Sequence, residues 1–205
     1  MAACRYAIEF PVHSGSFRLM ADRFGFLASA SAVVLSIVSL SVAISANRTQ
    51  ERLLAASVWP SLEYGTGNRD DDGADVITLS IGNSGIGPAR LRTVQVLYGD
   101  QPAEDSAALL RSCCELAKGT KLTTITSSTR ARVLKPGEDV SFLRLPLANN
   151  DGALWQRFNK ERFAVRVKAC YCSVLDECWM LDSTAIEPVP TKACPAVPDG
   201  EQWHG

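Results

Sequence analysis

Seven cysteines are the residues of this 205-residue chain with the most reactive side chains. Cys4 stands near the N-terminus, apart from the rest. The other six are Cys113, Cys114, Cys170, Cys172, Cys178 and Cys194. An even set of cysteines in one segment is typical of a disulfide framework in an oxidising compartment. The sequence contains no Cys-x-x-Cys pair, which disfavours both a thioredoxin-like centre and a zinc ribbon.

The spacing of four of these cysteines predicts how they pair. Cys172 and Cys178 flank a five-residue loop, and in a hairpin their side chains would face each other at disulfide distance. Closing so short a loop would stabilise the fold by about 2–3 kcal/mol. Cys170 points to the same sheet face as Cys172, so we expect it to reach either Cys194 or the segment that carries the remaining two cysteines.

Those remaining two, Cys113 and Cys114, are neighbours in the chain. Adjacent cysteines rarely bond each other, so each is expected to pair elsewhere. An alternative hypothesis treats the Cys170–Cys178 region as the centre of a thiol-disulfide redox protein. Structural disulfides are the preferred interpretation, because the spacing that redox centres use is missing.

Histidines lie only near the two ends, at His13 and His204. A Ser-His-Asp or Cys-His arrangement inside the central region is therefore excluded, as is a zinc site built on a core histidine. No Asp or Glu stands isolated in an apolar stretch where burial would raise its pKa. We therefore expect no catalytic residues, no metal site and no cofactor.

A run of 24 uncharged residues, Phe24–Asn47, lies between Arg23 and Arg48. As a helix it would reach about 36 Å, and the hydrocarbon core of a bilayer is about 30 Å thick. This length predicts one membrane span. A cleaved secretory signal is the alternative, with small residues at 43–46 for a peptidase, but the apolar run is longer than a usual signal core.

Small residues recur along one side of this predicted helix. They are Gly25, Ser29, Ala32, Ser36, Ser39, Ala43 and Ala46. Such a seam lets membrane helices approach closely, and its 3.5-residue period implies a left-handed crossing. A homodimer, or a subunit of a membrane complex assembled through this helix, is one hypothesis. Chance is the other, because half of the segment is Gly, Ala or Ser.

Cysteine distribution and charge agree on the orientation in the membrane. Three arginines precede the helix and two follow it closely, which mildly favours a cytoplasmic N-terminus. The six clustered cysteines all follow the helix. We therefore predict a bacterial inner-membrane protein with its C-terminal domain in the periplasm or outside the cell. The sequence has no basic stripe, so nucleic acid is not an expected partner.

Beyond the helix the apolar pattern has the period of a strand. Ile77, Leu79 and Ile81 alternate with more polar neighbours, and turns recur between such runs. One helical insert is predicted at 104–118 and a short helix at 151–161. The expected organisation is a tail at 1–23, a transmembrane helix with its extension at 24–58, a β domain at 59–186, and an extended Pro-rich tail at 187–205.

Two turn motifs carry a resemblance to a known family. Asn83-x-Gly85-x-Gly87-Pro88-Ala89, followed later by Leu134-x-Pro136-Gly137-Glu138, resembles the pattern of bacterial immunoglobulin-like modules related to cell adhesion. The whole layout is similar to small single-pass bacterial membrane proteins of unassigned function. The resemblance implies an antiparallel immunoglobulin-like β-sandwich with a short helical insert, preceded by one transmembrane helix. The insert and the cysteine-rich end depart from the adhesion modules.

The expected function is that of a membrane-anchored, extracytoplasmic binding or accessory module for an envelope protein partner, without catalysis. Binding residues are disproportionately found on loops held by a rigid scaffold. The loops at 65–73 and 82–88 are therefore the candidate contact segments.

Overall fold

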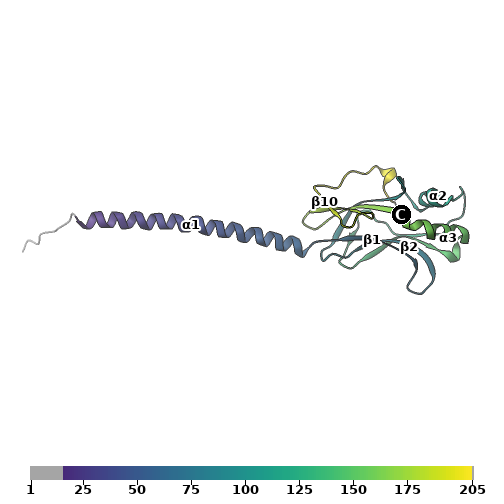
Figure 1. The fold of residues 1–205 in the computed structure, drawn as a ribbon, viewed down its shortest axis with the longest axis horizontal. Coiled ribbons are helices and arrows are strands. Elements are labelled where there is room, and N and C mark those ends of the chain that lie inside the picture. The colour runs from purple at the N-terminus through teal and green to yellow at the C-terminus, as the bar shows by residue number, and fades with distance from the viewer. Residues whose placement is uncertain (1–15, 205) are drawn as a thin grey trace, which may run out of the picture. The chain divides into compact units, whose positions relative to one another are not determined.

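The structure, a computed structural model, describes residues 16–204, with side chains from residue 29 onward. It forms two compact units, 1–52 and 53–205, which are considered separately below. The first unit holds most of a long helix, and the second holds all of the strands. Figure 1 shows both.

Helix α1 runs without interruption from Ser16 to Ser57. It begins earlier than the predicted Phe24, so the expected tail at 1–23 is helical from Ser16; residues 1–15 lie outside the described part. It ends just before Trp59-Pro60, where proline cannot continue a helix. Ser29–Ser57 is long and apolar enough to cross a membrane, and a signal sequence satisfies the same criterion.

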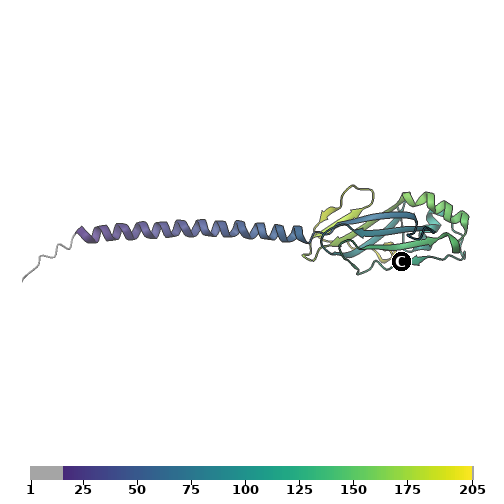
Figure 2. The same cartoon turned by 90° about the horizontal axis from the view of Figure 1, so that it is seen from below.

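The second unit consists of two antiparallel sheets, which Figures 1 and 2 show as separate layers. The first sheet has the order β1 (Leu62–Arg69), β2 (Asp75–Asn83), β7 (Asp139–Pro146), β5 (Ile125–Thr126). The second has the order β10 (Val189–Thr191), β9 (Cys178–Asp182), β8 (Val165–Cys172), β3 (Ala89–Tyr98), β4 (Gln101–Ala103), and β6 (Val133–Leu134) pairs with β3. The predicted antiparallel two-sheet domain is confirmed.

The core lies between the sheets and follows from the alternation in the strands. Ile77, Leu79 and Ile81 of β2 are fully buried, as the period of two predicts. The facing side is built from residues such as Val96 and Val167 of the second sheet. Burial of these side chains is the main favourable contribution to folding.

Two short helices lie side by side at one end of the β domain (Figure 1). Helix α2 (Ser106–Cys114) begins at Asp105, and helix α3 (Gly152–Glu161) begins at Asp151. In each case the aspartate side chain accepts a hydrogen bond from a backbone N–H in the first turn, which is the preferred way to begin a helix. Three 3-10 turns complete the description: η1 (Leu147–Asn149), η2 (Arg162–Ala164) and η3 (Asp199–Glu201).

The C-terminal segment is the main correction to the predicted fold. It was expected to lie extended over the domain, but it forms β10 and η3 and places Trp203 in the core. The Trp203 ring meets Phe142 of the first sheet edge-on at 5.5 Å between centroids, and its backbone N–H donates to Val94 O of the second at 2.9 Å. Burial of this large ring helps to hold the proline-rich segment against the domain.

Candidate functional site

An open groove of about 500 Å³ lies between the edge strand β1 of the first sheet and strand β9 of the second. The segment that leads into β10 forms its remaining wall. Four aromatic residues line it, Trp59, Tyr64, Tyr171 and Trp179, together with two carboxylates, Glu63 and Glu187. The other lining residues are Ser61, Leu62, Leu181, Ser183, Ala185, Ile186 and Pro188. An apolar hollow with a few polar groups is the usual form of a binding site.

The aromatic side chains of the groove come from three separate segments. Tyr171, from the centre of the second sheet, is buried and stacks on Trp179 with ring centroids 5.8 Å apart. Trp59 comes from the segment after α1 and is half exposed. Burial raises the pKa of Tyr171 to about 12, although the Leu62 N–H donates to its hydroxyl and lowers the pKa slightly. The hydroxyl therefore stays neutral and connects the two sheets.

Strand β1 has a free edge along the groove. The Ser84 N–H donates to Ser61 O at 2.9 Å, which sets the hydrogen-bond pattern between β1 and β2. In this antiparallel pair the backbone groups of residue 61, and of every second residue after it, bond to β2. The backbone N–H and C=O groups of Tyr64 and Thr66 consequently point away from β2. Among the described residues no strand pairs with β1 on that side. Such an edge can accept a further strand.

Tyr64 and Thr66 are held from within the domain. The Tyr64 hydroxyl is buried without a hydrogen bond of normal geometry, and burial raises the pKa of Tyr64 to about 12, against smaller opposing effects of Thr66 and Arg162. Arg162 donates from Nη1 to the Thr66 hydroxyl at 3.1 Å, and its guanidinium lies over the Phe163 ring. These contacts fix the side chains of both residues.

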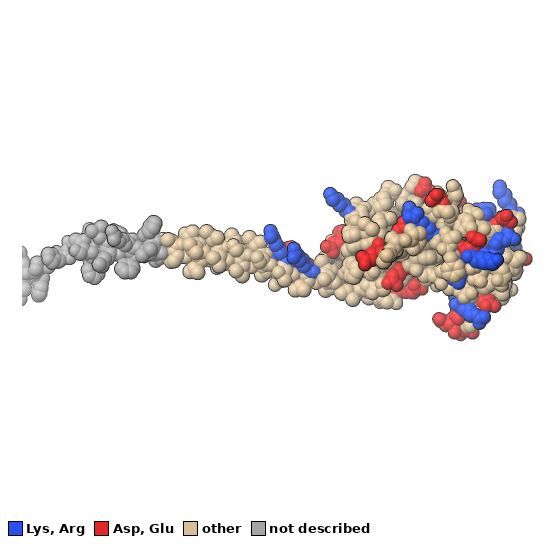
Figure 3. All heavy atoms as spheres, viewed as in Figure 1, with Lys and Arg blue, Asp and Glu red and all other residues tan. Residues whose placement is uncertain are grey.

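The groove is acidic at its rim. Glu63 is exposed and accepts a hydrogen bond from the Ser84 hydroxyl at 2.7 Å, and Glu187 is exposed as well. Elsewhere, on the face seen in Figure 3, basic and acidic side chains are interspersed over the β domain. Two carboxylates beside exposed aromatic faces suit a ligand that combines apolar bulk with positive charge.

The turn at 82–88, expected as a contact loop, instead holds the segment that follows α1. The N–H groups of Ile86 and Gly87 both donate to Trp59 O, at 3.0 and 3.1 Å. A Cβ added to Gly87 would lie 1.9 Å from Val58 O, so only glycine permits this approach. The turn thereby positions Trp59 at the groove. The other expected loop, 65–73, contributes no lining residue.

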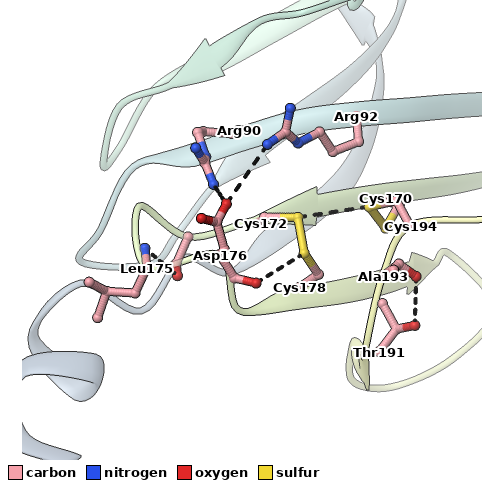
Figure 4. Close-up of a disulfide and its surroundings, with 11 residues drawn as sticks. Arg90, Arg92, Cys170, Cys172, Leu175, Asp176, Cys178, Thr191, Ala193 and Cys194 are labelled. Atoms are coloured by element: carbon pink, nitrogen blue, oxygen red, sulfur yellow. Dashed lines mark hydrogen bonds and ion pairs between the residues drawn. A yellow bond between two sulfur atoms is a disulfide. The ribbon is translucent and has the colours of Figure 1, made fainter. Parts of the chain in front are cut away.

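Two disulfides support the second sheet beside the groove (Figure 4). Cys172 and Cys178 are directly paired across β8 and β9 and are bonded to each other, as their spacing predicts. Cys170 bonds to Cys194, one of its two expected partners. Sγ of Cys172 lies 3.9 Å from Sγ of Cys194, so the two bridges are in contact. Together they fix β9, which carries Trp179, and the C-terminal segment.

The third disulfide joins Cys113 to Cys114, so the expectation that each pairs elsewhere is wrong. The two residues end α2, where Glu115 turns the chain into the left-handed region at φ 54°. The four other cysteines that the structure describes are already paired in the second sheet. Among the described residues, Cys113 and Cys114 are therefore left to pair with each other, which the sequence rule does not anticipate.

The small-residue seam lies on α1 and is separate from the groove. Its residues from Ser29 to Ala46 are exposed, and the Ser36 hydroxyl donates to Ala32 O at 2.8 Å. Gly25 lies in the part of α1 for which only the backbone is described. Helix packing through this seam stays a prediction.

The described histidine has no nucleophile beside it. His204 contacts Arg130 through Nδ1 at 3.1 Å and Asp199 O through Nε2 at 2.9 Å. The six cysteines described are all in disulfides.

The groove itself was not predicted from the sequence, because its lining comes from segments more than a hundred residues apart. No local pattern in the sequence marks it.

Comparisons of this chain with protein-family models, with curated proteins and with solved structures found no match.

Proposed function

We propose that this protein is a membrane-anchored binding module whose groove takes an extended segment of an envelope protein, without catalysing a reaction on it. One observation carries the proposal: the free edge of β1 runs along an aromatic groove. Edge strands are a common recognition surface, because an added strand gains backbone hydrogen bonds while its side chains enter adjacent pockets.

The lining favours a particular kind of segment. An aromatic or aliphatic side chain of the partner would pack on Trp59 and Trp179, which already present ring faces. A Lys or Arg nearby would be attracted by Glu63 and Glu187. The proposed ligand is therefore an extended peptide segment with alternating apolar and basic residues. Alternation places both kinds of side chain correctly on a paired strand.

The proposed location is the outer face of a bacterial inner membrane, with the N-terminus in the cytoplasm. Two observations support it: the apolar helix α1 is long enough to span a bilayer, and the domain holds three disulfides. We also propose that the two sheets belong to the immunoglobulin-like class that the Asn83 and Leu134 motifs suggested. The helices α2 and α3 would then be insertions into that class.

Site-specific photo-crosslinking on the full chain in native membranes tests the proposal. A photoreactive residue at Ile186, which is fully exposed on the groove wall, should capture a protein; the same residue at Ile125, exposed on β5 at the opposite edge of the first sheet, should not. The decisive comparison is Thr66→Pro against Thr66→Ala. Both lose the hydroxyl that Arg162 contacts, but only proline removes the outward N–H.

Capture from Ile186 should fall about tenfold in Thr66→Pro and stay near the wild-type level in Thr66→Ala. Near-ultraviolet circular dichroism of both variants checks that the domain is folded. A second pair of changes, Glu63→Gln with Glu187→Gln, should weaken capture and reduce its dependence on salt. Equal capture by the proline and alanine variants would rule out strand addition at β1.

A further inference from the structure

The bond between Cys113 and Cys114 differs from the other two disulfides in ways that point to chemistry. We propose that it is an exchangeable disulfide, which a dithiol reductant opens while the Cys170–Cys194 and Cys172–Cys178 bridges stay closed. The opened pair would then be a vicinal dithiol that binds thiophilic reagents. This inference is independent of the groove and its proposed partner.

The first reason is that this bridge contributes little to holding the fold. It closes a ring between neighbouring residues, so it removes almost no freedom from the unfolded chain. The other two bridges join residues 6 and 24 positions apart in the sequence, so each constrains the unfolded chain more.

The second reason is access. Cys113 is partly exposed at the end of α2, whereas Cys114 is buried. A hollow of about 200 Å³ opens beside Cys114, with Glu115, Thr120, Asp151 and Arg157 among its lining residues. An attacking thiolate can therefore approach Sγ of Cys113 from solvent, and the leaving sulfur of Cys114 has space beside it.

The exchange is a two-electron reduction of the protein bridge. A thiolate of the reductant attacks Sγ of Cys113, forms a mixed disulfide, and breaks the bond to Cys114, which leaves as a thiolate and takes up a proton. The second thiol of the reductant then attacks the reductant sulfur that is bonded to Cys113. This step closes the reductant into a cyclic disulfide and releases Cys113 as a thiol. The protein gains two hydrogen atoms, and the reductant becomes a disulfide.

The other two bridges differ in what they hold together. Each also has one buried cysteine, in β8, and one partly exposed cysteine, Cys178 or Cys194. Cys172–Cys178 joins directly paired strands, and Cys170–Cys194 holds the segment that carries the buried Trp203. The packed sheet and the C-terminal segment keep the two sulfur atoms of each bridge together, which favours the closed form.

Differential alkylation on the full chain in detergent tests this order. The folded protein is treated with increasing dithiothreitol, alkylated, denatured and digested with trypsin. Cleavage after Arg111 and Lys118 gives a peptide, 112–118, that holds both cysteines of the bridge. Cleavage after Lys168 and Lys192 separates peptide 169–192, with three cysteines, from 193–205 with Cys194. Peptide 112–118 thus reports the Cys113–Cys114 bridge alone, peptide 193–205 reports Cys170–Cys194, and peptide 169–192 reports both bridges of the second sheet.

At low reductant, alkylation of peptide 112–118 should exceed that of 169–192 by about tenfold or more. A parallel sample, reduced in the same way, freed of dithiothreitol and left unalkylated, should bind one phenylarsine oxide per chain, with two As–S bonds formed and one water released, and Cys113→Ser should abolish this. Denaturant added before the reductant should remove the difference between peptides. Three bridges that open together in the folded protein would overturn the proposal, as would a 112–118 peptide already linked to another.

Discussion

The side-chain amide of Asn83 donates a hydrogen bond of 3.1 Å to the backbone carbonyl of Leu134, across fifty-one residues of sequence. This bond joins the two turn motifs that stood out in the sequence. The same amide donates to Gly87 O at 2.8 Å, while its oxygen accepts from Ser61 N at 3.2 Å and Gly85 N at 3.1 Å. Asn83 is buried with every polar atom of its side chain satisfied.

Replacing Asn83 by alanine should therefore be severe. The change leaves four backbone groups without their partner in a buried site, and each unsatisfied group costs about 1–3 kcal/mol. We expect Asn83→Ala to destabilise the domain by about 3 kcal/mol or more, measured by urea unfolding of the full chain in detergent. Ser84→Ala, at the exposed neighbour, should change the stability by less than about 0.5 kcal/mol. Similar effects of both variants would contradict this role for Asn83.

The close approach of Gly87 to Val58 gives a second prediction. A methyl group at Gly87 has no room, since the facing atom belongs to the backbone and not to a flexible side chain. Gly87→Ala should destabilise the domain by about 3 kcal/mol and expose residues 58–61 to proteolysis. Gly152→Ala is the matched control: it has open space at the first position of α3, so it should be neutral or stabilise by up to about 1 kcal/mol. Limited proteolysis with mass spectrometry locates the cut.

The alternation in β2 was readable from the sequence because its largest apolar side chains all fall on one face. Ile77, Leu79 and Ile81 have their predicted orientation, and α1 ends at Ser57, one residue before the predicted end at 58. Local chemistry decides such features, so a short stretch of sequence contains enough information. The turn motifs were recognised too, but their partner in space, the segment 58–61, gave no signal of its own.

Features set by distant contacts were not readable in this way. Trp203 sits among prolines and polar residues, with no periodicity around it, yet it is buried. The Cys113–Cys114 bond goes against a general preference, and only the three-dimensional positions of the other sulfurs determine it. The groove needs residues 59 and 179 to meet, which sequence alone does not reveal.

Trp203 should be as important as any residue in a strand. Trp203→Ala removes a fully buried ring that packs on Phe142, and such truncations cost about 3–5 kcal/mol. Thermal unfolding followed by near-ultraviolet circular dichroism should show a lower midpoint and lost aromatic signal. Ile186→Ala, a fully exposed position in the same C-terminal region, should leave the midpoint unchanged. A Trp203 variant as stable as the wild type would mean that the C-terminal segment is not part of the core.

Asp182 should make the stability of the domain fall in acid. Arg166 donates to both of its carboxylate oxygens, with 2.8 Å from Nε to Oδ1, and so holds the pKa of Asp182 well below its usual range; the Thr184 hydroxyl and N–H add to this. A carboxyl with a lower pKa in the folded state binds protons more readily when unfolded. Its stabilisation is therefore complete above the unfolded pKa, about 3.9, and is lost as the pH falls toward the lower folded value.

The measurement is the free energy of unfolding of wild type and Asp182→Asn between about pH 6 and pH 2.5. Wild type should be the more stable near pH 6, and the difference should shrink as the pH drops below about 4. Glu138 adds to the acid sensitivity of both proteins, because the Lys135 N–H and Arg132 lower its pKa as well. The difference between the two curves of unfolding free energy against pH isolates the contribution of Asp182. A difference that stays constant with pH would show that the Arg166–Asp182 pair is not what links folding to protonation.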